Sequence, residues 1–380
     1  MSTYSQAVPV GTDPAQALRV LHVAGPAAGG ILAHVSHLLR GLDRNRYLPA
    51  VACPAGHELL EVAGELNLPA YVLPVQGMTS LGAASLALAR IARREGYQVL
   101  HTHSFTAAMA GCGANVCYPR VPLVCTIHNF LAPEARRRAR LERLAVGLIG
   151  VRAARIIAIS QALADVFPDQ SRVQVIYNGV ADPDPLPGPE ARQALGVPLE
   201  APVVGMVARL AAEKGVLQFV RICARIAQAL PEARFVLVGE GPLMSVVEHM
   251  VTQLHLWDRF VLPGRIENAG RLLRGMDVLL IPSLWEGASI TAVEAMAAGC
   301  PVIATRVGGL PEVLDGGKAG MLVNLGDEEG MASLAQYLLG DEARRLALAE
   351  AGREQAKKFS LSVMLEQTEA VYSSLFGRWK

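Results

Sequence analysis

The sequence has few cysteines, few aromatic residues and almost no net charge. Six cysteines occur among 380 residues, none in a CxxC pair, and aromatic residues make up 5%. We expect the thiols to be reduced core residues of a cytoplasmic protein. The formal net charge of +1 does not support general nucleic-acid binding, which needs a strong basic excess.

Long apolar runs are also missing. No uninterrupted apolar stretch approaches the roughly 20 residues that a membrane span needs. The start, MSTYSQAVPVGTDPAQAL, lacks the basic and apolar regions of a signal peptide. We expect residues 1–16 to be a disordered lead.

Short apolar runs alternate with helical patterns along the whole chain, which predicts α/β structure with parallel sheets. Residues 17–25 read as a strand, followed by a turn containing Gly29 and Gly30 and then by a helix; the dinucleotide fingerprint GxGxxG is absent. The pattern restarts after ADPDPLPGP (181–189), where the prolines exclude helix and central strand. Hydrophobic residues, at 52%, are sufficient for two cores.

These features predict two doubly wound, Rossmann-like domains that face each other across a cleft. The expected parts are an N-terminal domain (17–182), a linker (183–189), a C-terminal domain (190–360) and a final helical segment (361–380). The apolar residues of the last segment suggest that it packs back on the N-terminal domain.

Three histidines stand at expected strand ends: His101, His103 and His128. An HxH pair with a distant histidine can form a metal site. His101 and His103 need not converge, on the argument that alternate residues of a strand point to opposite faces. No carboxylate stands beside them in the sequence. Polar site residues or core histidines are therefore favoured over a metal site.

A basic segment covers residues 133–155 and contains Arg136, Arg137, Arg138 and Arg140. As an amphipathic helix it could contact the anionic inner face of a membrane or a phosphorylated acceptor. An ordinary solvated helix face accounts for the same composition.

Two glutamates with seven residues between them, Glu286 and Glu294, mark a stretch that reads as strand, loop and helix. Ser289 is the expected N-cap and Gly299 the expected end of the helix. A helix N-terminus at a strand end is an anion site, and carboxylates there suit sugar or ribose hydroxyls. Solvated glutamates would be the alternative.

Arg209 and Lys214 bracket another strand-to-helix loop and could bind a diphosphate without a divalent metal. A surface salt bridge between Lys214 and Glu213 is the alternative for that lysine.

Together these residues resemble glycosyltransferase family 4, whose members are retaining, nucleotide-sugar-dependent enzymes of GT-B fold. The most specific part is Glu286, seven residues, Glu294 and then AMAAGCPVIATRVGGLPE. The segments 209–215 and 239–242 match further family signatures. After Glu286, Gly-Ala-Ser-Ile departs from the commoner Gly-Phe-Gly or Gly-Leu-Pro, which leaves the donor sugar open.

The resemblance implies a catalytic set of His128, Arg209, Lys214 and Glu286. The implied donor-binding residues are Gly29, Gly30, Arg209, Lys214, Arg265, Ile266, Glu286, Ser289, Ile290, Thr291 and Glu294. No cofactor or metal ion is implied for the reaction.

The expected activity is therefore transfer of a sugar from a nucleotide diphosphate sugar, with UDP as the default, to a glycan or lipid-linked acceptor. Retention without an evident nucleophile favours same-face attack. Two alternatives remain: a non-hydrolysing UDP-sugar epimerase, and a non-catalytic nucleotide-sugar-binding partner subunit.

Overall fold

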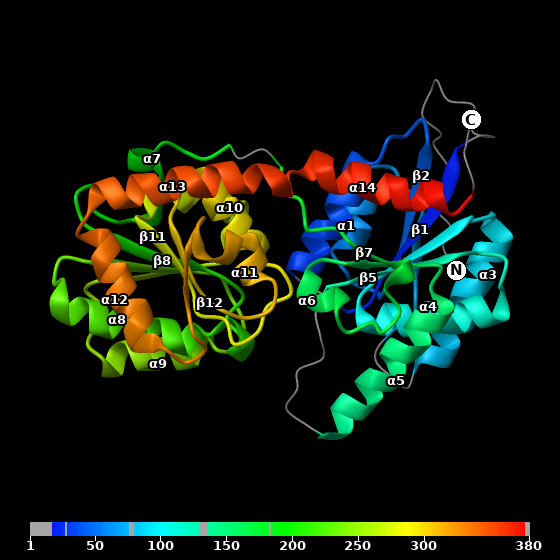
Figure 1. Cartoon of the computed structure of the whole chain (residues 1–380), viewed down its shortest axis with the longest axis horizontal. Coiled ribbons are helices and arrows are strands. Elements are labelled where there is room, and N and C mark those ends of the chain that lie inside the picture. The colour runs from blue at the N-terminus through cyan, green and yellow to red at the C-terminus, as the bar shows by residue number, and fades with distance from the viewer. Residues whose placement is uncertain (1–16, 27–28, 76–79, 129–135, 182–183, 377–380) are drawn as a thin grey trace. The chain divides into compact units, whose positions relative to one another are not determined.

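The computed structural model describes residues 17–26, 29–75, 80–128, 136–181 and 184–376, with residues 136–142 described as backbone only. The expected lead at 1–16 and the side chains of Arg136, Arg137, Arg138 and Arg140 lie outside this description. The chain forms two compact units, one of residues 1–179 and 361–380 and one of residues 180–360 (Figure 1). Each unit is treated by itself below.

Unit 1 contains a seven-stranded sheet in the order β3-β2-β1-β4-β5-β6-β7, and its strands pair in parallel. Its strands are β1 (Leu18–Ala24), β2 (Tyr47–Cys53), β3 (Ala70–Val72), β4 (Val99–His103), β5 (Leu123–Ile127), β6 (Arg155–Ala158) and β7 (Val173–Val175). Its helices are α1 (Gly30–Gly41), α2 (Leu59–Glu65), α3 (Leu81–Glu95), α4 (Phe105–Cys117), α5 (Arg136–Arg152), α6 (Gln161–Ala164) and α14 (Leu361–Ser374).

Helices cover both faces of this sheet: α1 and α14 lie on one side, and α3, α4 and α5 on the other (Figure 1). The strands β1, β4 and β5 are buried almost throughout, as expected for a parallel sheet covered on both faces. The strand order reverses between β1 and β4, and ligands of such sheets bind at the strand ends beside that point.

The C-terminal helix α14 is part of the unit 1 core. Val371 and Tyr372 pack in one apolar cluster with Leu38 and Tyr47. Arg46 forms an ion pair of 2.8 Å with Glu369 of α14. The last helix is thus bound to a domain from which it is separated by more than 180 residues of chain.

Unit 2 contains a six-stranded sheet in the order β10-β9-β8-β11-β12-β13, again with parallel pairing. Its strands are β8 (Val203–Val207), β9 (Arg234–Val238), β10 (Phe260–Gly264), β11 (Val278–Ile281), β12 (Val302–Thr305) and β13 (Met321–Val323). Its helices are α7 (Gly188–Leu195), α8 (Val216–Ala229), α9 (Met244–Gln253), α10 (Ile290–Ala298), α11 (Leu310–Val313), α12 (Glu328–Leu339) and α13 (Glu342–Ala356).

In unit 2, helices α8, α9 and α12 lie on one face of the sheet and α7, α10 and α13 on the other (Figure 1). The core between sheet and helices includes Phe219, Phe235 and Phe260. The strand order reverses between β8 and β11, so the loops after these two strands adjoin the expected ligand position.

The two parallel-sheet α/β domains predicted from the sequence are confirmed. One detail was wrong: residues 181–189 were expected to exclude helix, but Gly188 and Pro189 form the first turn of α7. Proline is compatible with the first turn because its missing N–H has no partner there in any helix. The units divide at Gly179 and Val180, a few residues before the expected linker.

Within the described ranges, no helix combines the length and the hydropathy required to cross a membrane.

Candidate functional site

The loop between β11 and α10 carries the first glutamate of the predicted pair, and α10 carries the second. Ser289 is the N-cap of α10, and its hydroxyl accepts a hydrogen bond from the Ala292 amide at 3.2 Å. Gly299 ends the helix in the left-handed conformation. The cap and the C-terminal glycine lie where the sequence predicts them, so Ile290 and Thr291 occupy the first turn, where backbone N–H groups have no intrahelical acceptor.

Lys214 and Glu286 form the central ion pair of this region. The Lys214 ammonium donates to both carboxylate oxygens, at 3.0 and 2.7 Å, and the Ser283 hydroxyl donates to the same carboxylate at 3.3 Å. The side chains are 28% and 10% exposed, respectively. The alternative of a Lys214–Glu213 salt bridge was wrong, because Glu213 pairs with Arg209 instead.

Backbone contacts join the two loops that carry Lys214 and Glu286. The Leu284 amide donates to the Glu213 carbonyl at 2.9 Å, which joins the loop after β11 to the loop after β8. Gly215 has a φ of +71°, and a Cβ there would overlap the Pro282 carbonyl. The two loops therefore pack main chain against main chain.

The main chain at Gly308 and Gly309 also packs closely against the loop that carries Glu286. The Gly309 amide donates to the Gly287 carbonyl at 2.9 Å. Gly308 has a φ of +51°, and a Cβ there would overlap the Glu286 carbonyl oxygen. Gly308 was not among the site residues predicted from the sequence, although it lies in the Val307-Gly-Gly-Leu-Pro run, whose two adjacent glycines indicate a close backbone approach.

Glu294 lies on α10, four residues after Ile290, and burial raises the pKa of its carboxyl group to about 7. A Cβ at Gly270 would come within 3.5 Å of its carboxyl carbon. The absent side chain at Gly270 leaves room beside the carboxylate for a ligand to approach.

Arg265 and Ile266 directly follow β10, which ends at Gly264 with a φ of +79°. The Arg265 side chain is half exposed and lies 3.5 Å from Glu240, in the turn after β9. These residues follow a strand of the same sheet as the strand before Arg209, and β9 lies between the two strands.

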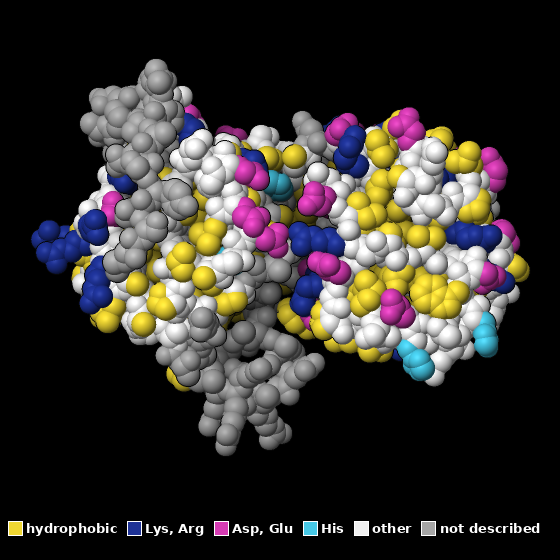
Figure 2. All heavy atoms as spheres, turned by 180° about the vertical axis from the view of Figure 1, so that it is seen from behind, with side chains coloured by type: hydrophobic (Ala, Val, Ile, Leu, Met, Phe, Trp, Pro, Cys, Tyr) yellow, Lys and Arg dark blue, Asp and Glu magenta, His cyan; other side chains and the backbone are white. Residues whose placement is uncertain are grey.

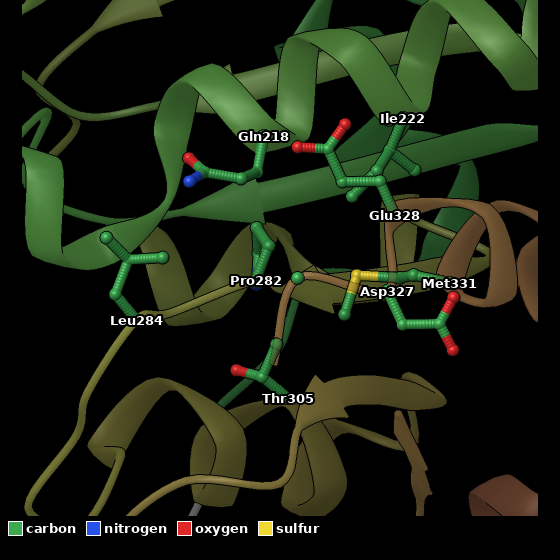
Figure 3. A pocket seen from close by; sticks show the side chains of 9 residues that line it. Gln218, Ile222, Pro282, Leu284, Thr305, Asp327, Glu328 and Met331 are labelled. Carbon is green, nitrogen blue, oxygen red and sulfur yellow. The ribbon is translucent and has the colours of Figure 1, made fainter. Parts of the chain in front are cut away.

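A small pocket of unit 2 is lined by residues of the loop that carries Glu286, but not by Glu286, Lys214 or Arg265. Its lining includes Gln218, Pro282, Leu284 and Thr305 (Figure 3). The space amounts to about 10 Å³, which is room for about one water molecule. It is too small for a sugar or a nucleotide.

In unit 1, Gly29 is the N-cap of α1 with a φ of +68°, and Gly30 is the first residue of the helix; both are exposed. A Cβ at Gly29 would meet nothing within 4 Å, so this glycine serves the backbone conformation and leaves the helix N-terminus open.

His128 follows β5 and is 6% exposed. It belongs to a cluster of five buried histidines, which are His22, His34, His101, His103 and His128. The argument against their convergence was wrong: the ring centroids of His101 and His103 lie 4.1 Å apart. Residues i and i+2 of a strand point to the same face, and only neighbouring residues alternate.

Burial lowers the pKa of all five imidazoles, and neighbouring cationic or imidazole groups lower it further. The pKa falls to about 3 for His22 and His34 and well below the usual range for His101, His103 and His128. The cluster is therefore neutral at physiological pH.

Comparisons with known proteins agree with these two units. A model described as glycosyltransferase family 4 matches residues 28–182, and one described as glycosyl transferases group 1 matches residues 188–355. The alpha-maltose-1-phosphate synthase of Mycolicibacterium smegmatis is 31% identical, over 77% of this chain and 83% of that protein. The chain belongs to glycosyltransferase family 4.

Two further similarities extend along the length of this glycosyltransferase. The D-inositol 3-phosphate glycosyltransferase of Corynebacterium efficiens is 29% identical, over 84% of this chain and 83% of that one. The crystal structure of Anabaena HepE in complex with UDP and glucose superposes with a TM-score of 0.82 at 25% identity, covering 94% of this chain and all of that one. The glycosyltransferase activity and GT-B fold predicted from the sequence are thus confirmed.

Proposed function

We propose that this glycosyltransferase transfers a sugar from a UDP-sugar with retention of anomeric configuration and without a divalent metal at the diphosphate. The observation that carries the proposal is the Lys214–Glu286 pair beside the N-terminus of α10, with Arg209 at the end of the adjoining strand. Cations and a helix N-terminus stabilise a diphosphate by themselves. UDP is supported by the HepE complex with UDP and glucose.

The donor roles follow the positions of the side chains in unit 2. Arg209 and Lys214 would bind the diphosphate, and Glu294 would accept hydrogen bonds from the ribose hydroxyls. Glu286 would bind hydroxyls of the donor sugar. The carboxylate that now pairs with Lys214 thus exchanges a cation for a hydroxyl when the diphosphate takes the lysine.

The remaining proposed donor-binding residues would contact the phosphates, the sugar and the base. Ser289, Ile290 and Thr291 would offer backbone amides to phosphate and sugar, since they begin α10. Arg265 and Ile266 would lie along the base. In unit 1, Gly29 and Gly30 would admit the diphosphate to the start of α1, and His128 would face the reacting sugar.

The proposed reaction proceeds on one face of the sugar. The bond from the anomeric carbon to the phosphate oxygen breaks, and its electron pair stays with the phosphate. The acceptor oxygen forms its bond on the same face, and its proton passes to the leaving phosphate. Lys214 and Arg209 stabilise the negative charge that develops there, an effect of about 3–4 kcal/mol by analogy with oxyanion donors.

The proposed acceptor is a glycan or a lipid-linked molecule. The exposed surface of α5 supports a lipid-linked one. Leu144, Leu148 and Val151 form an exposed apolar stripe at helical spacing, with 72%, 37% and 73% of each residue exposed. The stripe follows the arginine-rich start of the helix. An apolar stripe beside basic residues suits the surface of an anionic membrane.

The first test measures thermal stabilisation by UDP-, GDP- and ADP-sugars in excess EDTA, with Glu294→Ala as the control. A donor at about 100 times its Kd adds roughly 2.7 kcal/mol of stability. A shift with UDP-sugars alone, lost in the variant, supports the proposal. A shift only with another nucleotide, or one that requires Mg²⁺, overturns it.

The products distinguish the alternative activities. A retaining transferase releases UDP only when an acceptor is present and gives a product of unchanged anomeric configuration. Turnover of the UDP-sugar without acceptor would identify an epimerase. Binding without turnover across an acceptor panel would identify a non-catalytic subunit.

A further inference from the structure

Five imidazoles from four segments meet at the point of unit 1 where the strand order reverses. His22 lies in β1 two residues before its end, His101 lies in β4, His103 ends β4, His128 follows β5, and His34 lies on α1. The sheet register pairs His22 with His101 directly across neighbouring strands. They account for five of the nine histidines of the chain, and few histidines appear on the surface in Figure 2.

The rings are close enough to act as one group. Centroid distances are 4.7 Å between His34 and His128, 5.5 Å between His34 and His103, and 5.9 Å between His103 and His128. Each of these three residues offers a ring nitrogen within 4.8 Å of those of the other two.

Only some of the ring nitrogens in the cluster have hydrogen-bond partners. His101 is satisfied at both nitrogens, by the Tyr372 hydroxyl at 2.6 Å and the Thr126 hydroxyl at 2.7 Å. His103 Nε2 lies 3.0 Å from His22 Nδ1. Among the described residues, Nε2 of His22, Nδ1 of His103 and Nε2 of His128 have no hydrogen-bond partner, and the side chain next to His34 that can bond to it is that of Asn178.

A buried polar atom without a partner costs about 1–3 kcal/mol. In this cluster such atoms belong to His22, His103 and His128, and His103 and His128 lie together with His34.

We propose that His34, His103 and His128 bind a divalent transition-metal ion, of which Zn²⁺ is the best match. Zinc accepts three imidazole nitrogens at about 2.0 Å and leaves a fourth position for water. The three nitrogens now lie within 4.8 Å of one another, and they would move closer together to reach that distance from a common ion. The described groups contain no carboxylate, which disfavours Mg²⁺ and Ca²⁺.

The contact from His22 to His103 supports this assignment. Metal-binding histidines almost always use their second nitrogen for a hydrogen bond that fixes the orientation of the ring. His22 Nδ1 fills that position for His103. His101 is excluded as a ligand because both of its nitrogens are already used.

The proposed metal site and the cations proposed for the diphosphate consist of different residues: the histidines belong to unit 1, and Arg209 and Lys214 belong to unit 2. A bound ion would occupy His128 Nε2 and so prevent the contact with the sugar proposed above. That consequence rests on the proposed function, whereas the binding of the ion does not. Binding is therefore measured directly.

The experiment uses the full-length protein, stripped with EDTA and desalted, and titrated with Co²⁺ and Zn²⁺. We expect one ion per chain, visible as Co²⁺ absorption that Zn²⁺ abolishes. His34→Gln and His103→Gln should each weaken binding by roughly 100-fold or more. His37→Gln, on the same helix but outside both groups of three, should bind as the wild type does.

A second variant controls for surface imidazoles. The His249→Gln/His255→Gln double variant removes two exposed histidines of unit 2 and should leave the stoichiometry at one. Absence of a stoichiometric ion in the wild type overturns the proposal. Binding that persists in His34→Gln and disappears in the double variant also overturns it.

X-ray absorption of the zinc-loaded wild type gives an answer that does not depend on whether the variants fold. We expect about three imidazole nitrogens at about 2.0 Å from the ion. A sulfur ligand, or fewer than two imidazoles, would contradict the assignment.

Discussion

The Lys214 ammonium donates to both carboxylate oxygens of Glu286, at 3.0 and 2.7 Å. The two residues come from loops after different strands, and the Leu284 amide joins these loops through the Glu213 carbonyl. Without a donor, each side chain thus compensates the charge of the other. A diphosphate would have to attract Lys214 away from a carboxylate that is only 10% exposed.

Lys214→Ala should reduce turnover by about 10²–10³-fold, because the developing charge on the leaving phosphate loses a preorganised cation. Lys214→Arg keeps the charge and should retain more activity than the alanine variant. Steady-state rates with the donor identified by thermal stabilisation provide the measurement. Near-normal turnover of Lys214→Ala would remove the lysine from the mechanism.

Glu286→Gln should separate binding from transfer. Loss of the carboxylate frees Lys214, so we expect UDP alone to bind roughly 3–10-fold more tightly, since a partly exposed ion pair is worth about 1 kcal/mol. Sugar transfer should decrease, because the donor sugar loses a hydrogen-bond acceptor. Calorimetry gives the Kd of UDP and initial rates give transfer.

The matched control for that variant is Glu354→Gln, which breaks another lysine–glutamate ion pair of unit 2, the one with Lys357. It should leave UDP binding unchanged. If Glu286→Gln instead weakens UDP binding, the carboxylate serves to order the loop, and competition with the diphosphate is not its main effect.

Glu294 should make both stability and donor binding depend on pH. Burial raises its pKa from 4.5 to about 7, so the folded state holds a proton that the unfolded state has lost between these values. The free energy of unfolding is therefore highest below about pH 4.5, and it falls by about 3 kcal/mol as the pH rises through 7 and the buried carboxyl ionises.

Glu294→Gln should therefore raise the Tm relative to wild type at pH 8, with the difference vanishing near pH 4.5. The ionised carboxylate is the better acceptor for ribose hydroxyls, so the affinity for UDP should increase as the pH rises through 7 in the wild type only. A pH-independent difference in Tm would show that burial does not perturb this group.

Gly308→Ala should impair activity more than Gly316→Ala. Both glycines have positive φ, at +51° and +68°, so alanine strains the backbone by a similar amount at each. Only at Gly308 would the new Cβ overlap the Glu286 carbonyl, whereas at Gly316 nothing lies within 4 Å. We expect at least roughly tenfold lower kcat for Gly308→Ala than for Gly316→Ala, since small displacements of a site can cost this much. Equal rates would show that the Glu286 loop tolerates displacement.

Tyr372→Phe should destabilise unit 1 by about 1–3 kcal/mol, because it leaves the buried Nδ1 of His101 without its 2.6 Å partner. Tyr47→Phe is the control, since its hydroxyl makes only long contacts of 3.3 and 3.5 Å with α14. Urea unfolding measures both. An equal, small effect of the two variants would mean that the hydroxyl of Tyr372 does not stabilise the histidine cluster.

The sequence by itself determined the two parallel-sheet units, because buried strands read as short apolar runs and each is followed by a helical pattern. It also determined the position of α10, because Ser289 caps its start and Gly299 its end, and each cap bonds only to residues of the adjoining turn. Local signals of this kind depend on neighbouring residues only, so no tertiary information is needed. The resemblance to the family rested on Glu286, Glu294 and the segment that follows them, together with the segments 209–215 and 239–242.

Only the tertiary structure decided which side chains meet. Lys214 lies next to Glu213 in sequence but pairs with Glu286, 72 residues away, because β8 and β11 are neighbours in the sheet. Likewise, strand register and the packing of α1 bring five histidines together, and burial then sets their charge. Pairing partners and desolvation depend on the order of strands and on the packing of helices, neither of which is written in a local stretch of sequence.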